Sequence, residues 1–219
     1  MSPLLDHALI HGHPNRLRPA IDEILGSAIA EQSRVRQIAA ASRTYPEAVE
    51  DLVLISCSRY ELRLRISWPQ LEQSSDLSQI VSSCRWSVGA VVLSGGCRLE
   101  VFQKANRGIP VYEYGRSWKE GRAEHSTLLW GNSALKKVLE VSLIKGNTCA
   151  LLPCTLRRWV ADRDHLTSTL VLRVGSGSSH AEVFSRRPLP SSDGSTHSRL
   201  SESELSKRVE HYLSIVRLL

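Results

Sequence analysis

The chain has 219 residues, of which 42% are hydrophobic and 23% are charged, so its composition is that of a globular protein and excludes general disorder. Its formal net charge is +6, and its 28 basic residues are mostly arginine. The planar fork of arginine suits the recognition of phosphate and carboxylate groups. The excess is interpreted first as a solvated surface shaped by coding bias, with a face that binds an anionic partner as the alternative.

The cysteines and the N-terminal segment indicate where in the cell the protein is located. Five cysteines without a CxxC pair predict reduced thiols in an intracellular protein. Residues 1–14 lack the basic start and apolar run of a signal peptide, and no apolar stretch reaches the roughly 20 residues that span a bilayer. We expect a cytoplasmic location, with a nuclear or intravirion one as alternatives.

An amphipathic helix is predicted over Pro19 to Arg43, because the apolar residues from Ile21 to Ala39 recur at three-and-four spacing. Pro19 suits the first turn of such a helix. This helix is expected to pack on a sheet, or to pair in part with another copy of the protein.

The stretch from Leu52 to Trp68 begins with a short apolar run and continues as strict alternation. Leu62, Leu64 and Ile66 fall on one side of a strand, whereas Arg63 and Arg65 fall on the other. Successive side chains of a strand point to opposite faces of its sheet. One face should therefore be buried while the other stays wet and carries arginines.

Later segments predict further strands in antiparallel hairpins. Tight-turn residues join 86–93 to 97–103, and 141–144 to 148–152, and Ala181 to Phe184 can pair back onto 170–174. Residues 126–139 and 156–164 are expected to be helical. The predicted fold class is α+β, mainly an antiparallel sheet with amphipathic helices at the N- and C-termini; a partly closed barrel is the alternative.

The predicted domain organisation has four parts. Residues 1–14 form a flexible arm, 15–187 a single α+β domain, 188–200 a Ser/Pro linker and 201–219 an amphipathic helix. The apolar stripe of this last helix docks either on its own domain or on a partner. It consists of Leu205, Val209, Tyr212, Leu213 and Val216.

A basic face is predicted between Arg116 and Arg187, where twelve Lys or Arg stand against six Asp or Glu. Aromatic residues interleave with basic ones near its start, as single-stranded nucleic-acid binding requires, although Tyr112 and Trp118 could equally be core residues at a strand end. The candidate nucleic-acid-binding residues are Arg116, Trp118, Lys119, Arg122, Lys136, Lys137, Arg157, Arg158, Arg186 and Arg187. An acidic protein partner would suit the same face.

Motifs that announce catalysis are missing from the sequence. It contains no GxSxG elbow, HExxH helix, Walker loop or GxGxxG turn, and no ligand spacing that predicts a metal or another cofactor. A carboxylate and histidine pair such as Asp162 and His165 remains a candidate site, since active sites can assemble from distant residues.

The sequence supports three functional hypotheses. The leading one is a non-enzymatic nucleic-acid-binding or assembly protein, with RNA favoured as the ligand. The second is a protein-interaction or structural subunit, which would self-associate or bind a protein partner through its terminal helices. The third is an enzyme with a carboxylate and histidine site on the open face of the sheet.

Overall fold

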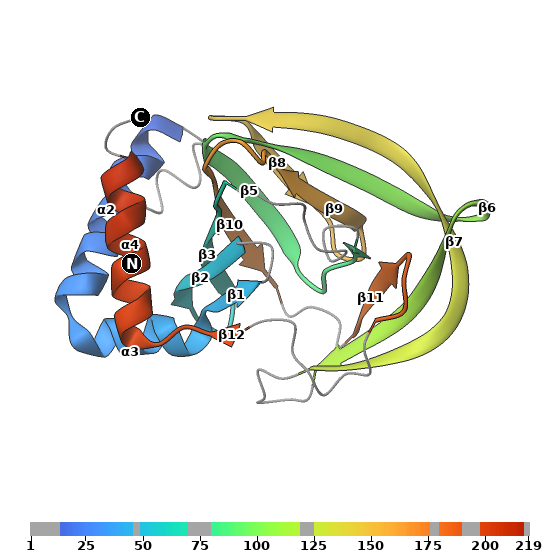
Figure 1. The fold of residues 1–219 in the computed structure, drawn as a ribbon, viewed down its shortest axis with the longest axis horizontal. Coiled ribbons are helices and arrows are strands. Elements are labelled where there is room, and N and C mark those ends of the chain that lie inside the picture. Colours follow the sequence, from blue (N-terminus) through green and yellow to red (C-terminus); the bar gives the residue numbers. More distant parts are fainter. Residues whose placement is uncertain are drawn as a thin grey trace.

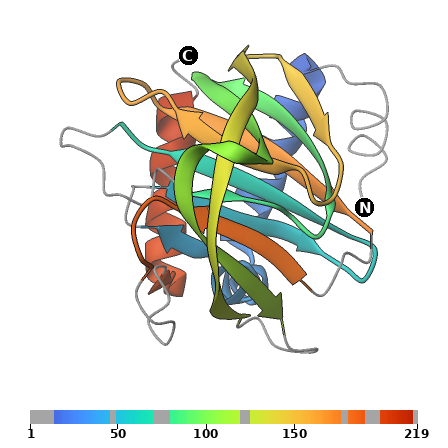
Figure 2. The ribbon, with the colours of Figure 1, turned by 90° about the vertical axis from the view of Figure 1, so that its right-hand side faces the viewer.

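Two antiparallel sheets face each other in the computed structural model, and three helices cover the far side of one of them (Figure 1). The structure describes residues 14–45, 49–69, 80–118, 125–175, 180–189 and 198–216. Seen from the side of the second sheet, its long strands cross in front of the first sheet, and the helices lie behind both (Figure 2).

The first sheet has seven strands within the described residues. In spatial order they are β12 (Ser198–Arg199), β1 (Arg43–Tyr45), β2 (Val49–Ser56), β3 (Tyr60–Ser67), β10 (Thr167–Val174), β5 (Ser87–Ser94) and β8 (Thr148–Leu151). The second sheet has five strands, again counted over the described residues. Their order is β11 (His180–Ser185), β4 (Val81–Ser82), β9 (Leu156–Ala161), β6 (Gly96–Trp118) and β7 (His125–Ile144). This arrangement agrees with the predicted antiparallel α+β class and places the strands in a sandwich of two sheets.

The helices are α2 (Pro14–Ala30), α3 (Gln32–Ala41) and α4 (Glu202–Val216). The single helix predicted over 19–43 is divided, because Glu31 between α2 and α3 has an extended backbone. The start of α4 has reciprocal capping bonds: the Glu204 backbone N–H donates to Ser201 Oγ, and the Ser201 backbone N–H donates to the Glu204 carboxylate. None of these described helices is both long and apolar enough to cross a lipid bilayer.

The main core lies between the helices and the seven-stranded sheet. Strand β3 contributes Leu62, Leu64 and Ile66 to this core, and none of them is exposed to solvent. Its alternate residues Arg63 and Arg65 point to the opposite face, toward the second sheet. The period-two pattern therefore separates a dry face from an arginine-bearing face, as the sequence predicts.

The predicted hairpins are wrong in their pairing. The chain does turn at Gly95, but β5 belongs to the seven-stranded sheet and β6 to the five-stranded one. The turn at residues 145–147 likewise leads from β7 in one sheet to β8 in the other, and β10 and β11 lie in different sheets. Each of these turns connects two layers of the sandwich.

Two predicted helices are strands. Residues 126–139 lie in β7, which pairs with β6 along its whole length, and residues 156–161 form β9. Of the five apolar residues that a helix here would turn inward, Leu128, Leu129, Val138 and Leu139 are about half or more exposed, and Leu135 is buried. Pairing with β6 therefore overrides the helical spacing of these apolar residues.

Two predicted segments fall outside the described residues. They are most of the N-terminal arm and most of the Ser/Pro linker.

Candidate functional site: an arginine-lined cavity

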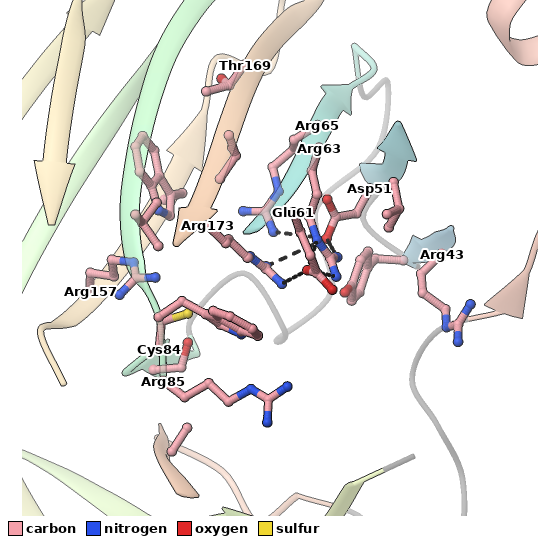
Figure 3. Close-up of a pocket in the computed structure, with 18 of the residues that line it drawn as sticks. Arg43, Asp51, Glu61, Arg63, Arg65, Cys84, Arg85, Arg157, Thr169 and Arg173 are labelled. Atoms are coloured by element: carbon pink, nitrogen blue, oxygen red, sulfur yellow. Dashed lines mark hydrogen bonds and ion pairs between the residues drawn. The ribbon is translucent and has the colours of Figure 1, made fainter. Parts of the chain in front are cut away.

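A cavity of about 600 Å³ lies between the two sheets, on the side of the seven-stranded sheet that faces away from the helices (Figure 3). Residues of β1, β2, β3, β5 and β10 line it from one sheet, and residues of β4, β6, β9 and β11 line it from the other. This volume is within the range of about 300 to 1,000 Å³ that is typical of small-molecule sites.

The lining is strongly basic. Eight arginines line the cavity, whereas its acidic lining residues are Asp51 and Glu61. The arginines are Arg43, Arg63, Arg65, Arg85, Arg116, Arg157, Arg158 and Arg173. Because positive groups outnumber negative ones eight to two, the cavity attracts anions.

Asp51 on β2 is the centre of an ion-pair cluster on the seven-stranded sheet. Its carboxylate is 2% exposed and accepts a hydrogen bond of 2.7 Å from Arg63 Nη1. Arg65 and Arg173 approach the same oxygen, Asp51 Oδ2, at 4.0 and 3.9 Å. Three neighbouring strands, β2, β3 and β10, thus bring one carboxylate and three guanidinium groups together.

Glu61 on β3 completes this cluster. Arg63 Nη2 donates to Glu61 Oε2 at 2.7 Å, and Arg173 Nη1 lies 3.7 Å from the same oxygen. Arg173 therefore approaches both carboxylates but makes no close bond to either. The Nε groups of Arg65 and Arg173 are buried without an acceptor among the described residues.

The electrostatics of the cluster keep Asp51 ionised. Burial alone would raise its pKa, but Arg63, Arg65 and Arg173 outweigh that effect and lower the pKa from 3.8 to about 2. In turn Asp51 and Glu61 overcome the burial of Arg63 and raise the pKa of its guanidinium. A carboxylate with so low a pKa is a poor proton carrier near neutral pH, so Asp51 is suited to hold arginines in place.

A second buried carboxylate neutralises one arginine of the opposite sheet. Glu100 on β6 is 2% exposed and accepts a bond of 2.6 Å from Arg158 Nε. Arg98 Nε and Lys137 Nζ lie 3.3 and 3.5 Å from the other Glu100 oxygen. Arg158 is therefore already paired inside the protein.

Arg116 on β6 belongs to neither of these ion-pair clusters. Its Nε is buried and has no hydrogen-bond acceptor among the described residues. Burial lowers the pKa of its guanidinium, and the nearby Tyr45 offsets part of this effect. Arg116 is thus a largely buried cation that faces the cavity without a described carboxylate partner.

Arg43 and Arg157 are held by backbone oxygens. Arg43 Nη1 donates to the carbonyl oxygens of Ala40 and Ser42 at 3.0 and 2.7 Å, and Arg157 Nη1 donates to that of Thr155 at 3.2 Å. Such bonds orient a guanidinium, and neither arginine is bonded to a carboxylate among the described residues.

Aromatic and aliphatic side chains share the lining with these arginines. The Arg85 guanidinium lies 4.9 Å from the centre of the Trp86 ring. Tyr45, Val53, Trp86, Val88 and Trp159 add apolar surface to the lining. The cavity thus offers both cationic groups and apolar walls.

The donor set does not fit a metal ion. No group of three or more His, Cys, Asp or Glu side chains with metal-binding geometry occurs in the described part of the chain. Of the described residues that line the cavity, none is a histidine, and Asp51 and Glu61 are bound to arginines. Metal sites in proteins are built mainly from histidine, cysteine and carboxylate ligands, and this cavity does not supply such a set.

Asp162 and His165 do lie together, but away from the cavity. His165 Nδ1 is 2.9 Å from Asp162 Oδ2, and the His165 side chain is 73% exposed. The same Asp162 side chain accepts a bond from the Asp164 backbone N–H, so it closes a local turn after β9. The pair therefore has the geometry of a surface turn.

The residues predicted to bind nucleic acid do not form one face. Arg116, Arg157 and Arg158 line the cavity. The other described ones are spread over the surface: Lys136 and Lys137 are exposed on β7, and Arg186 and Arg187 are exposed after β11. Trp118 ends β6, and Lys119 and Arg122 lie outside the described residues.

The apolar stripe of α4 packs within its own chain. Leu205, Val209, Tyr212, Leu213 and Val216 are all buried in the core beneath the helix layer. Tyr212 also donates a hydrogen bond of 3.1 Å to Ser168 on β10. Of the two predicted docking modes, the structure shows the intramolecular one.

Comparisons with known proteins find similarity in solved structures alone. No protein-family model and no curated protein matches the sequence. The hydroquinone 1,2-dioxygenase PnpCD, solved with Cd²⁺ and 4-hydroxybenzonitrile, is 18% identical over 65% of this chain and 71% of its own, with a TM-score of 0.36. The hydroquinone 1,2-dioxygenase of Sphingomonas sp. TTNP3, solved with 4-hydroxybenzoate, is 13% identical over 62% of this chain and 69% of its own, with a TM-score of 0.36.

A third similar structure is Rru_A2000 from Rhodospirillum rubrum, a cupin-2 domain. It is 14% identical over 77% of this chain and 79% of its own, with a TM-score of 0.27. With TM-scores below 0.5, the activities of these three proteins are not carried over to this chain.

The prediction of a non-enzymatic nucleic-acid-binding or assembly protein is wrong. Arg116, Arg157 and Arg158, which are central to that prediction, line a cavity between the sheets and are not displayed on an outer surface. A duplex or an extended strand needs an exposed basic surface that tracks its phosphates.

Most residues of this site are not predicted from the sequence. Arg43, Asp51, Glu61, Arg85 and Arg173 are not among the candidate residues that it suggests. The signal in the sequence is the alternation in β3. It places Glu61, Arg63 and Arg65 on the non-core face of a central strand, where they must face either solvent or a second layer. A second sheet supplies that layer.

Proposed function

We propose that this protein binds a small organic anion in the cavity between its sheets. The proposal rests on Arg116, a residue of the cavity lining. The Nε of its guanidinium is buried and has no hydrogen-bond acceptor among the described residues. A buried cation without a partner costs free energy, and a bound carboxylate or phosphate would remove that cost.

The lining supports an organic ligand over a simple inorganic ion. An inorganic ion would fill a small part of about 600 Å³. Trp86, Tyr45 and Val88 offer apolar surface beside the arginines, and ligand sites commonly combine apolar walls with a few polar groups. The ligand proposed here has anionic groups and an apolar body.

The burial of Arg116 also predicts a trade-off between stability and binding. Replacing an unpaired buried charge by an apolar side chain of similar length is often neutral or stabilising. Arg116→Met should therefore leave the free protein as stable as the wild type or more so, while removing the partner of the anion.

The test compares Arg116→Met with Arg186→Met, since both remove one positive charge but Arg186 is exposed and outside the cavity. Calorimetric titration at constant ionic strength uses succinate, tricarballylate and methyl phosphate as probes. We expect saturable binding of at least one probe to the wild type and to Arg186→Met, and a loss of about tenfold or more in affinity for Arg116→Met. Equal binding by all three proteins, or no binding of any probe to the wild type, would contradict the proposal.

A further inference from the structure

The charges around the cavity are not evenly compensated. Arg63, Arg65 and Arg173 surround the carboxylates of Asp51 and Glu61. On the other sheet, Arg158 is paired with Glu100. These four arginines have anionic partners supplied by the protein itself.

Three further arginines of the lining have no carboxylate bond in the described structure. Arg43 and Arg157 donate to backbone carbonyl oxygens, and Arg116 has a buried Nε without an acceptor. A neutral carbonyl oxygen satisfies a hydrogen bond but does not cancel a charge. Because cavity walls of low dielectric strengthen repulsion between like charges, three such cations in one cavity favour the entry of negative charge.

These three cations come from different parts of the fold. Arg43 lies on β1 of the seven-stranded sheet, whereas Arg116 and Arg157 lie on β6 and β9 of the five-stranded sheet. In Figure 3, Arg43 and Arg157 lie on opposite sides of the view, with Arg173 between them. Arginines on opposite sides of the cavity are suited to bind separate anionic groups.

We infer that the ligand is a polyanion, with two or more carboxylate or phosphate groups separated along its body. This inference rests on the proposed function and specifies the ligand class of the same site. One anionic group would bind Arg157 on the five-stranded sheet, and another would bind Arg43 and Arg116, both of which interact with Tyr45. Arginine forks bind both oxyanions in the same bidentate way, so the two chemistries share this prediction.

The experiment measures the affinities of a graded series of probes at pH 7 and constant ionic strength. Propionate, succinate and tricarballylate carry one, two and three carboxylates, and methyl phosphate and methylenediphosphonate form the phosphorus arm. We expect affinity to rise about tenfold or more with each added anionic group in at least one arm. The arm with the steeper rise identifies the oxyanion.

Single variants separate the two ends of the cavity. Arg43→Met and Arg157→Met should each weaken the binding of the polyanions by about tenfold, and each should reduce the advantage of a polyanion over the corresponding monoanion. Arg186→Met serves as the charge-matched control and should bind as the wild type does. Circular dichroism and unfolding midpoints check that each variant is folded.

The outcomes distinguish the two proposals. Monoanions that bind as tightly as polyanions, with Arg116→Met still defective, would overturn the polyanion inference and leave the anion site standing. A wild-type protein that binds no probe of either arm would overturn both.

Discussion

Asp51 gives the sharpest prediction for stability, because its carboxylate holds three arginines of the cavity wall. The change is Asp51→Asn, which keeps the shape of the side chain and removes its charge. The pKa of Asp51 is lowered from 3.8 to about 2. At 1.36 kcal/mol for each pKa unit, this shift corresponds to about 2 kcal/mol of stabilisation near neutral pH.

The amide also leaves Arg63, Arg65 and Arg173 with Glu61 as their remaining described carboxylate, and breaking a buried ion pair costs about 3 to 5 kcal/mol in other proteins. We therefore expect Asp51→Asn to lower the free energy of unfolding by about 2 to 4 kcal/mol. The measurement is urea denaturation at pH 7, followed by tryptophan fluorescence and circular dichroism. Asp162→Asn is the matched control, because Asp162 pairs with His165 on the surface and should contribute less than about 1 kcal/mol. A loss for Asp51→Asn no larger than that of the control would refute the electrostatic reasoning.

Three other predictions concern pH, backbone strain and thiol reactivity. Because the folded-state pKa of Asp51 is depressed, the stabilisation from this carboxylate is present above pH 3.8 and is lost as the pH falls toward 2. The difference in unfolding free energy between the wild type and Asp51→Asn should therefore shrink between pH 3.8 and 2. A difference that stays constant over this range would contradict the assignment. Gly95 has φ of +66°, and a Cβ at this position would lie 2.5 Å from the backbone oxygen of Leu166. Gly95→Ala should therefore lower the free energy of unfolding, measured by urea denaturation, by about 2 kcal/mol or more. The control is Gly26→Ala in α2, where a Cβ would have no atom within 4 Å, and its stability should be unchanged or higher. Burial raises the pKa of Cys97 to about 11, so iodoacetamide should label Cys97 at least about 100-fold more slowly than exposed Cys57, as peptide mass mapping would show; equal rates would mean that Cys97 is accessible.

Local patterns predict the turns better than the pairing of strands. Gly95 and the turn at residues 145–147 do reverse the chain direction, as their turn chemistry indicates. Whether two strands on either side of a turn pair with each other depends on the other strands that compete for their edges. Strand β10, far along the chain, pairs with both β3 and β5, and no local pattern contains that information.

The same limit applies to the site. Alternation in β3 predicts that Arg63 and Arg65 share a face opposite to the core, and they do. The residues that meet them come from distant segments: Arg173 on β10 adjoins them in the same sheet, and Arg116 on β6 lies in the other sheet. Long-range strand order, which local patterns do not reveal, turns a face expected to be wet into the wall of a cavity.

The most direct test of the central claim is a crystal structure of the protein grown with a saturating concentration of tricarballylate. We expect the anion between the two sheets, with one carboxylate bonded to Arg116 and another close to Arg157. An empty cavity, or an anion found only on the outer surface of the protein, would contradict it.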